Sequence, residues 1–192
     1  MKQIKTSRNQ INILNLVLFI QFEIRDKVAM LHKTVGNIKN GFNLIMTAKI
    51  IDGKAIAEQN LNKLKQEILE RENNDIRRPC LAVILVGDDP ASSIYVNKKK
   101  SACENVGIKS VSHQLPTDTK QSNLNDLINT LNQDEDVDGI LVQSPLPKHL
   151  DEELIIELIS PNKDVDGFHP FNIGSLAIRQ PRLRSCTPYG VI

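Results

Sequence analysis

The stretch CLAVILVGDDP, residues 80–90, decides the fold class. Its first seven residues are all apolar, which is typical of a strand covered on both faces, as in a parallel sheet. The polar GDDP ends the strand, and Asp89 and Pro90 are residue types that begin helices. The segment therefore predicts a buried strand that leads into a helix, which we expect to run to about Val106 and to stop at Gly107.

Further strands and helices are predicted in alternation on both sides of this unit. Apolar residues at helical spacing predict a first helix at about 54–72. The later elements are a strand at 108–115, a helix at about 121–131, a strand at 139–142 and a helix at 151–159. The order predicts an α/β fold, an open and mainly parallel sheet flanked by helices. Ligands of such sheets bind beyond the carboxyl ends of the strands. The loops at those ends are 87–93, 143–149 and the stretch after Asp164.

Composition excludes several partner classes. The 192 residues carry 24 basic and 23 acidic side chains, so no strong field is present to hold nucleic acid or an anionic membrane. Aromatic residues make up 4% of the chain, which disfavours a stacking platform for single strands. The three cysteines have neither metal-ligand nor redox-motif spacing, and reduced thiols in a cytoplasmic protein are expected.

The first 45 residues differ from the rest. The apolar run INILNLVLFIQF, residues 11–22, follows a basic start as in a signal peptide, but it lacks a small-residue cleavage site and is too short to span a bilayer. A compact beginning follows Met46 instead. We therefore expect 1–45 to be an extension outside the fold, either through a start site assigned too far upstream or through poor order, and 46–192 to form the domain.

One lysine lies within an apolar helix face. The residues at offsets 0, 4, 7, 8 and 11 of the helix before Gly107 share a face: Tyr95, Lys99, Ala102, Cys103 and Val106. Lys98 and Lys100 point roughly 100° to either side, toward solvent. Lys99 either extends along the helix to solvent or is partly desolvated. Desolvation would lower its pKa and make it a usable acid or base near neutrality.

Two later clusters carry polar groups into the same loops. Gln143 ends a strand before Pro145 and Pro147, so its amide either satisfies backbone groups or faces a substrate and orients the lysine. In the segment PNKDVDGFHP, residues 161–170, a calcium loop fails because position 12 is Ile173. Asp164 is interpreted as a turn-forming carboxylate, and His169 as a loop or structural histidine.

Together these segments resemble the methylenetetrahydrofolate dehydrogenase/cyclohydrolase family. The matching motifs, in order, are AKIIDGKAIA (48–57), VILVGDDPASSIYV (83–96), YVNKKKSACENVGI (95–108), GILVQSPLPKHL (139–150), PNKDVDGFHPFNIGSL (161–176) and CTPYG (186–190). The resemblance implies that Lys99 is the central acid/base residue and that Tyr95 stacks on the folate. It also implies that Gln143 orients the lysine and Asp166 holds the pterin, with Pro145 and Leu146 lining the substrate site.

The family's activity is also implied: oxidation of 5,10-methylenetetrahydrofolate with NADP, then hydrolysis of the methenyl product to 10-formyltetrahydrofolate, without a metal. This one-carbon chemistry makes the family both an oxidoreductase and a hydrolase that serve purine biosynthesis. Two residues depart from the family pattern. Ser144 stands where Leu is usual and Ser185 where Pro is usual.

The family's CTPxG motif leads into a Rossmann domain for NADP, and no Gly-x-Gly occurs in this sequence. We therefore expect the NADP domain to be missing from this chain, which leaves dehydrogenase activity by the chain alone and the family's homodimer in question. The alternative is a truncated, non-catalytic folate-binding remnant.

Overall fold

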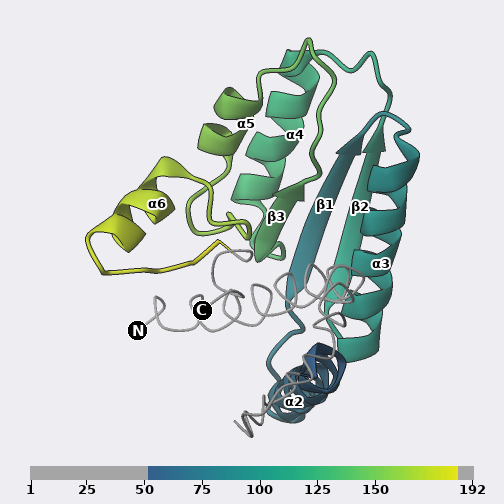
Figure 1. The fold of residues 1–192 in the computed structure, drawn as a ribbon, viewed down its shortest axis with the longest axis vertical. Coiled ribbons are helices and arrows are strands. Elements are labelled where there is room, and N and C mark those ends of the chain that lie inside the picture. Colours follow the sequence, from purple (N-terminus) through teal and green to yellow (C-terminus); the bar gives the residue numbers. More distant parts are fainter. Residues whose placement is uncertain (1–51, 186–192) are drawn as a thin grey trace, which may run out of the picture.

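A computed structural model of the chain describes residues 52–185 (Figure 1). The predictions made for the first 45 residues and for a start at Met46 lie outside the described residues. In chain order the elements are α2 (Gly53–Asn73), β1 (Cys80–Val86), α3 (Pro90–Val106), β2 (Lys109–Leu115), α4 (Gln121–Gln133), β3 (Gly139–Val142), α5 (Glu152–Leu158) and α6 (Pro170–Ala177).

The three strands form a parallel sheet in the order β2-β1-β3, with β1 in the centre. Cys80 pairs with Lys109 and Leu81 with Gly139, so the strands run in step and all end at the same edge. A single bridge between Ile140 and Asp164 lays the chain after α5 alongside β3. This bridge brings the segment that follows Asp164 to the carboxyl edge of the sheet.

Each face of the sheet has its own core, because alternate residues of β1 point to opposite sides. On one face Leu81, Val83 and Leu85 pack against residues of α2 and α3. On the other face Ala82 and Ile84 pack against residues of α4 and α5. Figure 1 shows α3 on one side of the strands and α4 with α5 on the other. All seven residues of β1 are buried, as the unbroken apolar run predicts.

The helix α3 begins and ends where the sequence indicates. The side chain of Asp89 accepts a hydrogen bond from the backbone N–H of Ser92, Pro90 opens the first turn, and Gly107 ends the helix in the left-handed conformation with φ 89°. These caps fix the start of α3 at the carboxyl edge of the sheet.

An ion pair closes the opposite edge of the sheet. The guanidinium of Arg77 donates to both oxygens of the buried Asp138 carboxylate, at 2.6 and 3.0 Å. The same carboxylate accepts from the backbone N–H of Cys80 at 2.9 Å. Asp138 therefore ties the segment before β1 to the segment before β3 by directed bonds.

The predicted elements agree with the structure to within a few residues, and the α/β class is confirmed. The helix α6 was not predicted; its large apolar residues, such as Phe171 and Ile173, are half exposed, so they form no buried stripe. Within residues 52–185, no helix combines the length and apolar character needed to cross a membrane.

Candidate functional site at the carboxyl edge of the sheet

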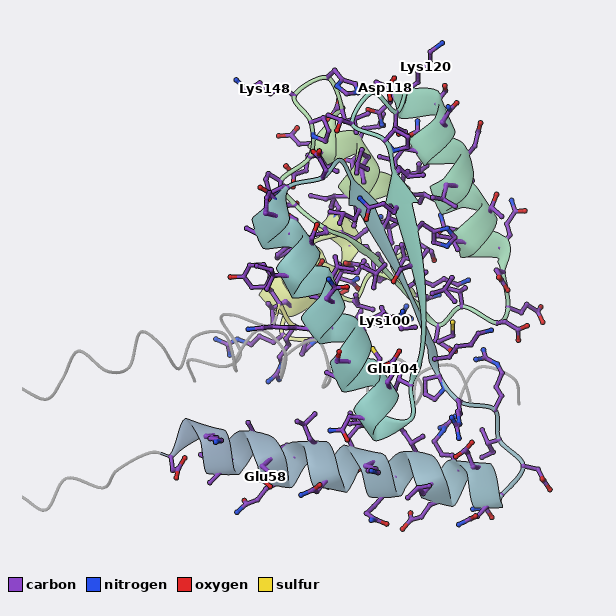
Figure 2. The ribbon with its side chains drawn as sticks, turned by 90° about the vertical axis from the view of Figure 1, so that its right-hand side faces the viewer. Glu58, Lys100, Glu104, Asp118, Lys120 and Lys148 are labelled. Atoms are coloured by element: carbon purple, nitrogen blue, oxygen red, sulfur yellow. The ribbon has the colours of Figure 1, made fainter. Side chains whose placement is uncertain are left out.

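The helix α3 buries one face against the sheet, and Lys99 belongs to that face. The buried residues of the helix are Ser92, Val96, Lys99, Cys103 and Val106. Lys99 is 4% exposed, whereas Lys98 and Lys100 are exposed. Figure 2 shows Lys100 and Glu104 one turn apart on α3. The prediction of a partly desolvated lysine between two solvated ones is confirmed.

Tyr95, one turn before Lys99, is less buried than the later residues of this face. Val96 occupies the buried position, and Tyr95 is 37% exposed. Tyr95 lies two turns closer to the carboxyl edge than Cys103, beyond the apolar core of the sheet, so less protein covers it. The ring is thus accessible next to the buried lysine, which is compatible with contact to a flat ligand.

Gln143 contacts Lys99 directly. Its backbone N–H donates to the carbonyl of Ile84 at 2.9 Å, which fixes it at the end of β3. The Lys99 ammonium donates to the Gln143 carboxamide oxygen at 2.9 Å, and the Gln143 amide nitrogen donates to the backbone carbonyl of Ser144 at 2.7 Å. Gln143 therefore satisfies a backbone group and also contacts the lysine, whereas its contact with a substrate stays a prediction. One end of the amide satisfies the backbone, and the other orients the lysine.

The two aspartates of the third cluster differ in surroundings. Asp164 is buried and accepts from the backbone N–H groups of Gly167 and His169 and from the side chain of Asn172, at 3.0, 2.9 and 2.9 Å. It is a turn-forming carboxylate, as predicted. His169 caps α6 by accepting from the N–H of Phe171 at 3.0 Å, so the structural interpretation of this histidine is also confirmed.

Asp166 faces the site with a perturbed acidity. Burial raises the pKa of its carboxyl to about 6, against the opposing field of the Lys99 ammonium and with a small addition from Asp164. The Lys99 ammonium therefore acts on the pKa of a carboxyl group that lies 67 residues away in the sequence (166 minus 99). Such a pair can accept from N–H donors and exchange a proton near neutral pH.

The loop after Gln143 supplies the remaining predicted residues. Pro145 follows a cis peptide bond and is exposed. Leu146 is half-buried and packs partly against the core shared with α4 and α5. Pro145 therefore has an exposed surface close to Gln143, whereas part of Leu146 supports the loop.

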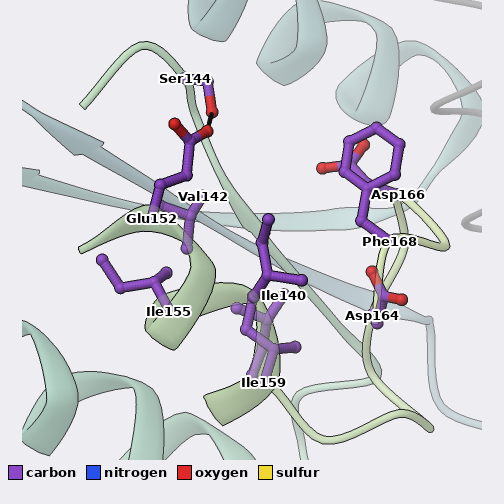
Figure 3. A pocket seen from close by; sticks show the side chains of 10 residues that line it. Ile140, Val142, Ser144, Glu152, Ile155, Ile159, Asp164, Asp166 and Phe168 are labelled. Atoms are coloured by element: carbon purple, nitrogen blue, oxygen red, sulfur yellow. Dashed lines mark hydrogen bonds between the residues drawn. The ribbon is translucent and has the colours of Figure 1, made fainter. Parts of the chain in front are cut away.

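A small cavity of about 40 Å³ lies between β3, α5 and the segment after Asp164, and Figure 3 shows the side chains that line it. Asp166 and Phe168 line one side of it, and Ser144 with Glu152 lie on another. The Ser144 hydroxyl donates to the Glu152 carboxylate. Sequence reasoning missed this pairing; the polar residue at position 144, where the family usually has Leu, was the available signal. The described residues hold no cluster of three His, Cys, Asp or Glu suited to a metal ion.

Comparison with known proteins decides the family. Residues 51–166 match the sequence model of the tetrahydrofolate dehydrogenase/cyclohydrolase catalytic domain. The chain belongs to this family. It is 61% identical over 147 residues to the bifunctional protein FolD of Methylobacillus flagellatus, a match that covers 77% of this chain and 51% of that protein. The fold expectation and the resemblance noted in the sequence are both confirmed.

Two solved structures of the family are similar to this one. The bifunctional enzyme from Campylobacter jejuni is 49% identical, with a TM-score of 0.70, and the match covers 73% of this chain and 50% of that one. The methylenetetrahydrofolate dehydrogenase-cyclohydrolase of Trypanosoma brucei, complexed with NADP and an inhibitor, is 35% identical with a TM-score of 0.70, covering 75% and 50%. The chain thus spans about half the length of the relatives it matches.

Proposed function

We propose that this chain provides the folate site of a methylenetetrahydrofolate dehydrogenase/cyclohydrolase, with Lys99 as its central acid/base residue. The observation that carries the proposal is the hydrogen bond from the buried Lys99 ammonium to the Gln143 carboxamide. A neutral amide fixes the position of the amine without neutralising it, which is what a group that must gain and lose a proton requires. Membership of the family supports the choice of folate as substrate.

In the hydrolytic step each of the predicted site residues has a role. Water adds to the bridging carbon of the methenyl cation, and Lys99 in its amine form takes a proton from the water oxygen. The carbinol hydroxyl then loses its proton as the bond from carbon to N5 breaks. N5 takes up a proton, which leaves the formyl group on N10. One proton is released overall. Asp166 accepts from the N–H groups of the pterin, Tyr95 stacks on the ring system, and Pro145 with Leu146 lines the site.

NADP is the oxidant of the family's dehydrogenase step, and we propose that the described residues do not hold it. A dinucleotide needs a glycine-rich turn between strand and helix and accessible N–H groups at the helix start. The turn from β1 to α3 reads Gly-Asp-Asp-Pro, and the Asp89 carboxylate already accepts from the N–H of Ser92 at 2.7 Å. The connections from β2 to α4 and from β3 to α5 contain no glycine. We therefore expect no NADPH formation by the 192-residue chain alone.

The test is the decay of methenyltetrahydrofolate absorbance in the presence of the full chain. Spontaneous hydrolysis is measured in a blank without protein. We expect Lys99→Ala to lower the enzymatic rate by roughly 100- to 10,000-fold, the usual contribution of general acid–base catalysis. Lys100→Ala, an exposed neighbour on the same helix, is the matched control and should retain the rate.

Equal decay in the unaltered chain, in Lys99→Ala and in the blank, with the chain shown to be folded, would contradict hydrolysis. Binding of 5-formyltetrahydrofolate, a stable reduced folate, would then identify the second candidate, a folate-binding remnant without catalysis.

The wider assignments belong to the same proposal. We propose that residues 46–192 form the catalytic folate domain and that 1–45 lie outside it. The setting we propose is the cytoplasm, in one-carbon metabolism that feeds purine biosynthesis, which suits the free and buried thiols of Cys80 and Cys103. We propose no nucleic acid, membrane or metal partner; the family homodimer would be tested by measuring mass in solution.

A further inference from the structure

The hydrogen bond that holds Lys99 continues beyond Gln143. The amide nitrogen of Gln143 donates to the Ser144 carbonyl at 2.7 Å, and the Ser144 hydroxyl donates to the carboxylate of Glu152. Figure 3 shows the Ser144 and Glu152 side chains pointing toward one another beside the cavity that Asp166 lines. A continuous path of hydrogen bonds and one backbone unit therefore joins the lysine on α3 to the first turn of α5.

The far end of this path is anchored. The Asp151 side chain accepts from the N–H of Leu154 at 3.0 Å and begins α5, while the Asp151 N–H donates to the side chain of Gln121 on α4 at 2.8 Å. Ile155, three residues after Glu152, is 1% exposed and packs in the core. Glu152 thus lies at the start of a helix that is held by hydrogen bonds and by core packing. Its bond to Ser144 therefore restrains the loop, and the loop does not restrain the helix.

The chemistry of position 144 makes this bond important. Ser144 lines the cavity beside Val142 and Ile155 and is exposed, as Glu152 is. Serine is too small and too polar to hold the loop by apolar contact with these residues. A hydroxyl that donates to a carboxylate forms a short, charge-assisted bond with a defined direction. At this position a directed bond, rather than apolar packing, therefore holds the loop next to Gln143.

We propose that Ser144 and Glu152 act as a pair of positioning residues, which fix the Gln143 carboxamide and through it the Lys99 amine. The expected change in kcat rests on the proposed function, whereas the positioning of the Gln143 amide by the pair does not. Neither residue touches the reacting atoms. Loss of the pair leaves the lysine in place and lets its amide partner move, and small misplacements of a positioned group lower turnover more than binding.

The test compares variants of the full chain by two measurements. The first is the NMR signal of the Gln143 side-chain NH₂, assigned by its loss in Gln143→Glu. The second is kcat and KM for methenyltetrahydrofolate hydrolysis. In Ser144→Ala and in Glu152→Ala we expect the NH₂ signals to shift and broaden, and kcat to fall roughly 5- to 20-fold with KM changed less than about 2-fold. The double variant should lose about as much kcat as either single variant, because all three remove the same contact.

Three further variants separate positioning from general damage. Ser144→Thr keeps the hydroxyl, and Ser144→Leu restores the family residue; both should keep most of the unaltered kcat. Glu153→Ala removes the adjacent exposed carboxylate on α5 and should change neither measurement.

Unchanged NH₂ signals in both alanine variants, or the same losses in Glu153→Ala, would overturn the proposal. If the unaltered chain hydrolyses nothing, the proposed activity fails. The NMR comparison still decides whether the pair positions Gln143.

Discussion

The two ends of the sheet both hold buried charge, but they hold it differently. At the amino end, the Asp138 carboxylate receives two bonds from Arg77 and one from a backbone N–H. At the carboxyl end, Lys99 donates a hydrogen bond to a neutral carboxamide, and burial raises the pKa of the neighbouring Asp166 to about 6. A buried charge with complementary bonds makes the fold depend on its partner, because removal of the partner leaves the charge uncompensated. A charge held by a neutral group, beside an acid of raised pKa, is arranged for a ligand and a proton.

The largest expected effect comes from loss of the ion pair at the amino end of the sheet. Arg77→Met would leave the Asp138 carboxylate, whose side chain is 4% exposed, without its counter-ion. We expect a loss of about 3 kcal/mol in the free energy of unfolding, the lower end for a broken buried pair because the Arg77 side chain is 40% exposed. Urea unfolding measures this loss. A loss below about 1 kcal/mol would mean that this end is not held by the pair.

The next effect is a gain in the free energy of unfolding when Asp166 is substituted. The folded carboxyl keeps its proton up to about pH 6, whereas in the unfolded chain it ionises near its ordinary value of 3.8. The folded state therefore binds more protons between these values, and stability falls as the pH rises through this window. Asp166→Asn removes the penalty, so at pH 7 the variant should be more stable by about 2 kcal/mol and less active.

Melting temperatures of the Asp166→Asn variant at pH 4 and pH 7 test this reasoning. The gain should be several degrees at pH 7 and much smaller at pH 4, where the folded carboxyl is protonated and the unfolded one is only about half ionised. Asp118→Asn, at an exposed position, is the control. A variant that is less stable than the wild type at pH 7 would mean that Asp166 supports the fold in the way Asp138 does.

The smallest expected effect concerns two glycines, Gly107 at the end of α3 and Gly174 in α6, which differ in the space around them. Gly107, which ends α3 near the amino end, has φ 89°, and an added Cβ would lie 3.1 Å from Ile68 Cγ2. Gly107→Ala should cost about 1 kcal/mol through strain at this left-handed position. Gly174 in α6 has nothing within 4 Å of an added Cβ, so Gly174→Ala should leave stability unchanged or slightly higher. Thermal unfolding of both variants checks the difference, and an equal loss in both would contradict it.

The sequence was sufficient for most elements, since their signals are local. The unbroken run before Gly87 and the caps of α3 are patterns of adjacent residues, and they predicted β1 and α3 nearly to the residue. The extent of burial along α3 was harder to predict, because the limit of the core at the sheet edge decides that Val96 is buried and Tyr95 is exposed. The helix α6 escaped prediction because its apolar residues are largely exposed.

The contacts within the site depended on the whole fold. Lys99 and Gln143 were singled out by unusual position, but their 2.9 Å contact follows from the register of β1 with β3, which no local pattern encodes. The bond from Ser144 to Glu152 joins a loop to a helix across a proline-rich turn. The sequence marked position 144 as unusual and carried no signal for its partner.

The most direct test of the contrast between the two ends is the free energy of unfolding of Lys99→Met, measured in urea beside Arg77→Met. Methionine fills a similar volume and removes the charge. If Lys99 is held for chemistry rather than for the fold, the variant should unfold within about 1 kcal/mol of the unaltered chain, while losing hydrolysis. A loss of about 3 kcal/mol, equal to that of Arg77→Met, would show that the lysine is a structural ion like its counterpart and would contradict the account.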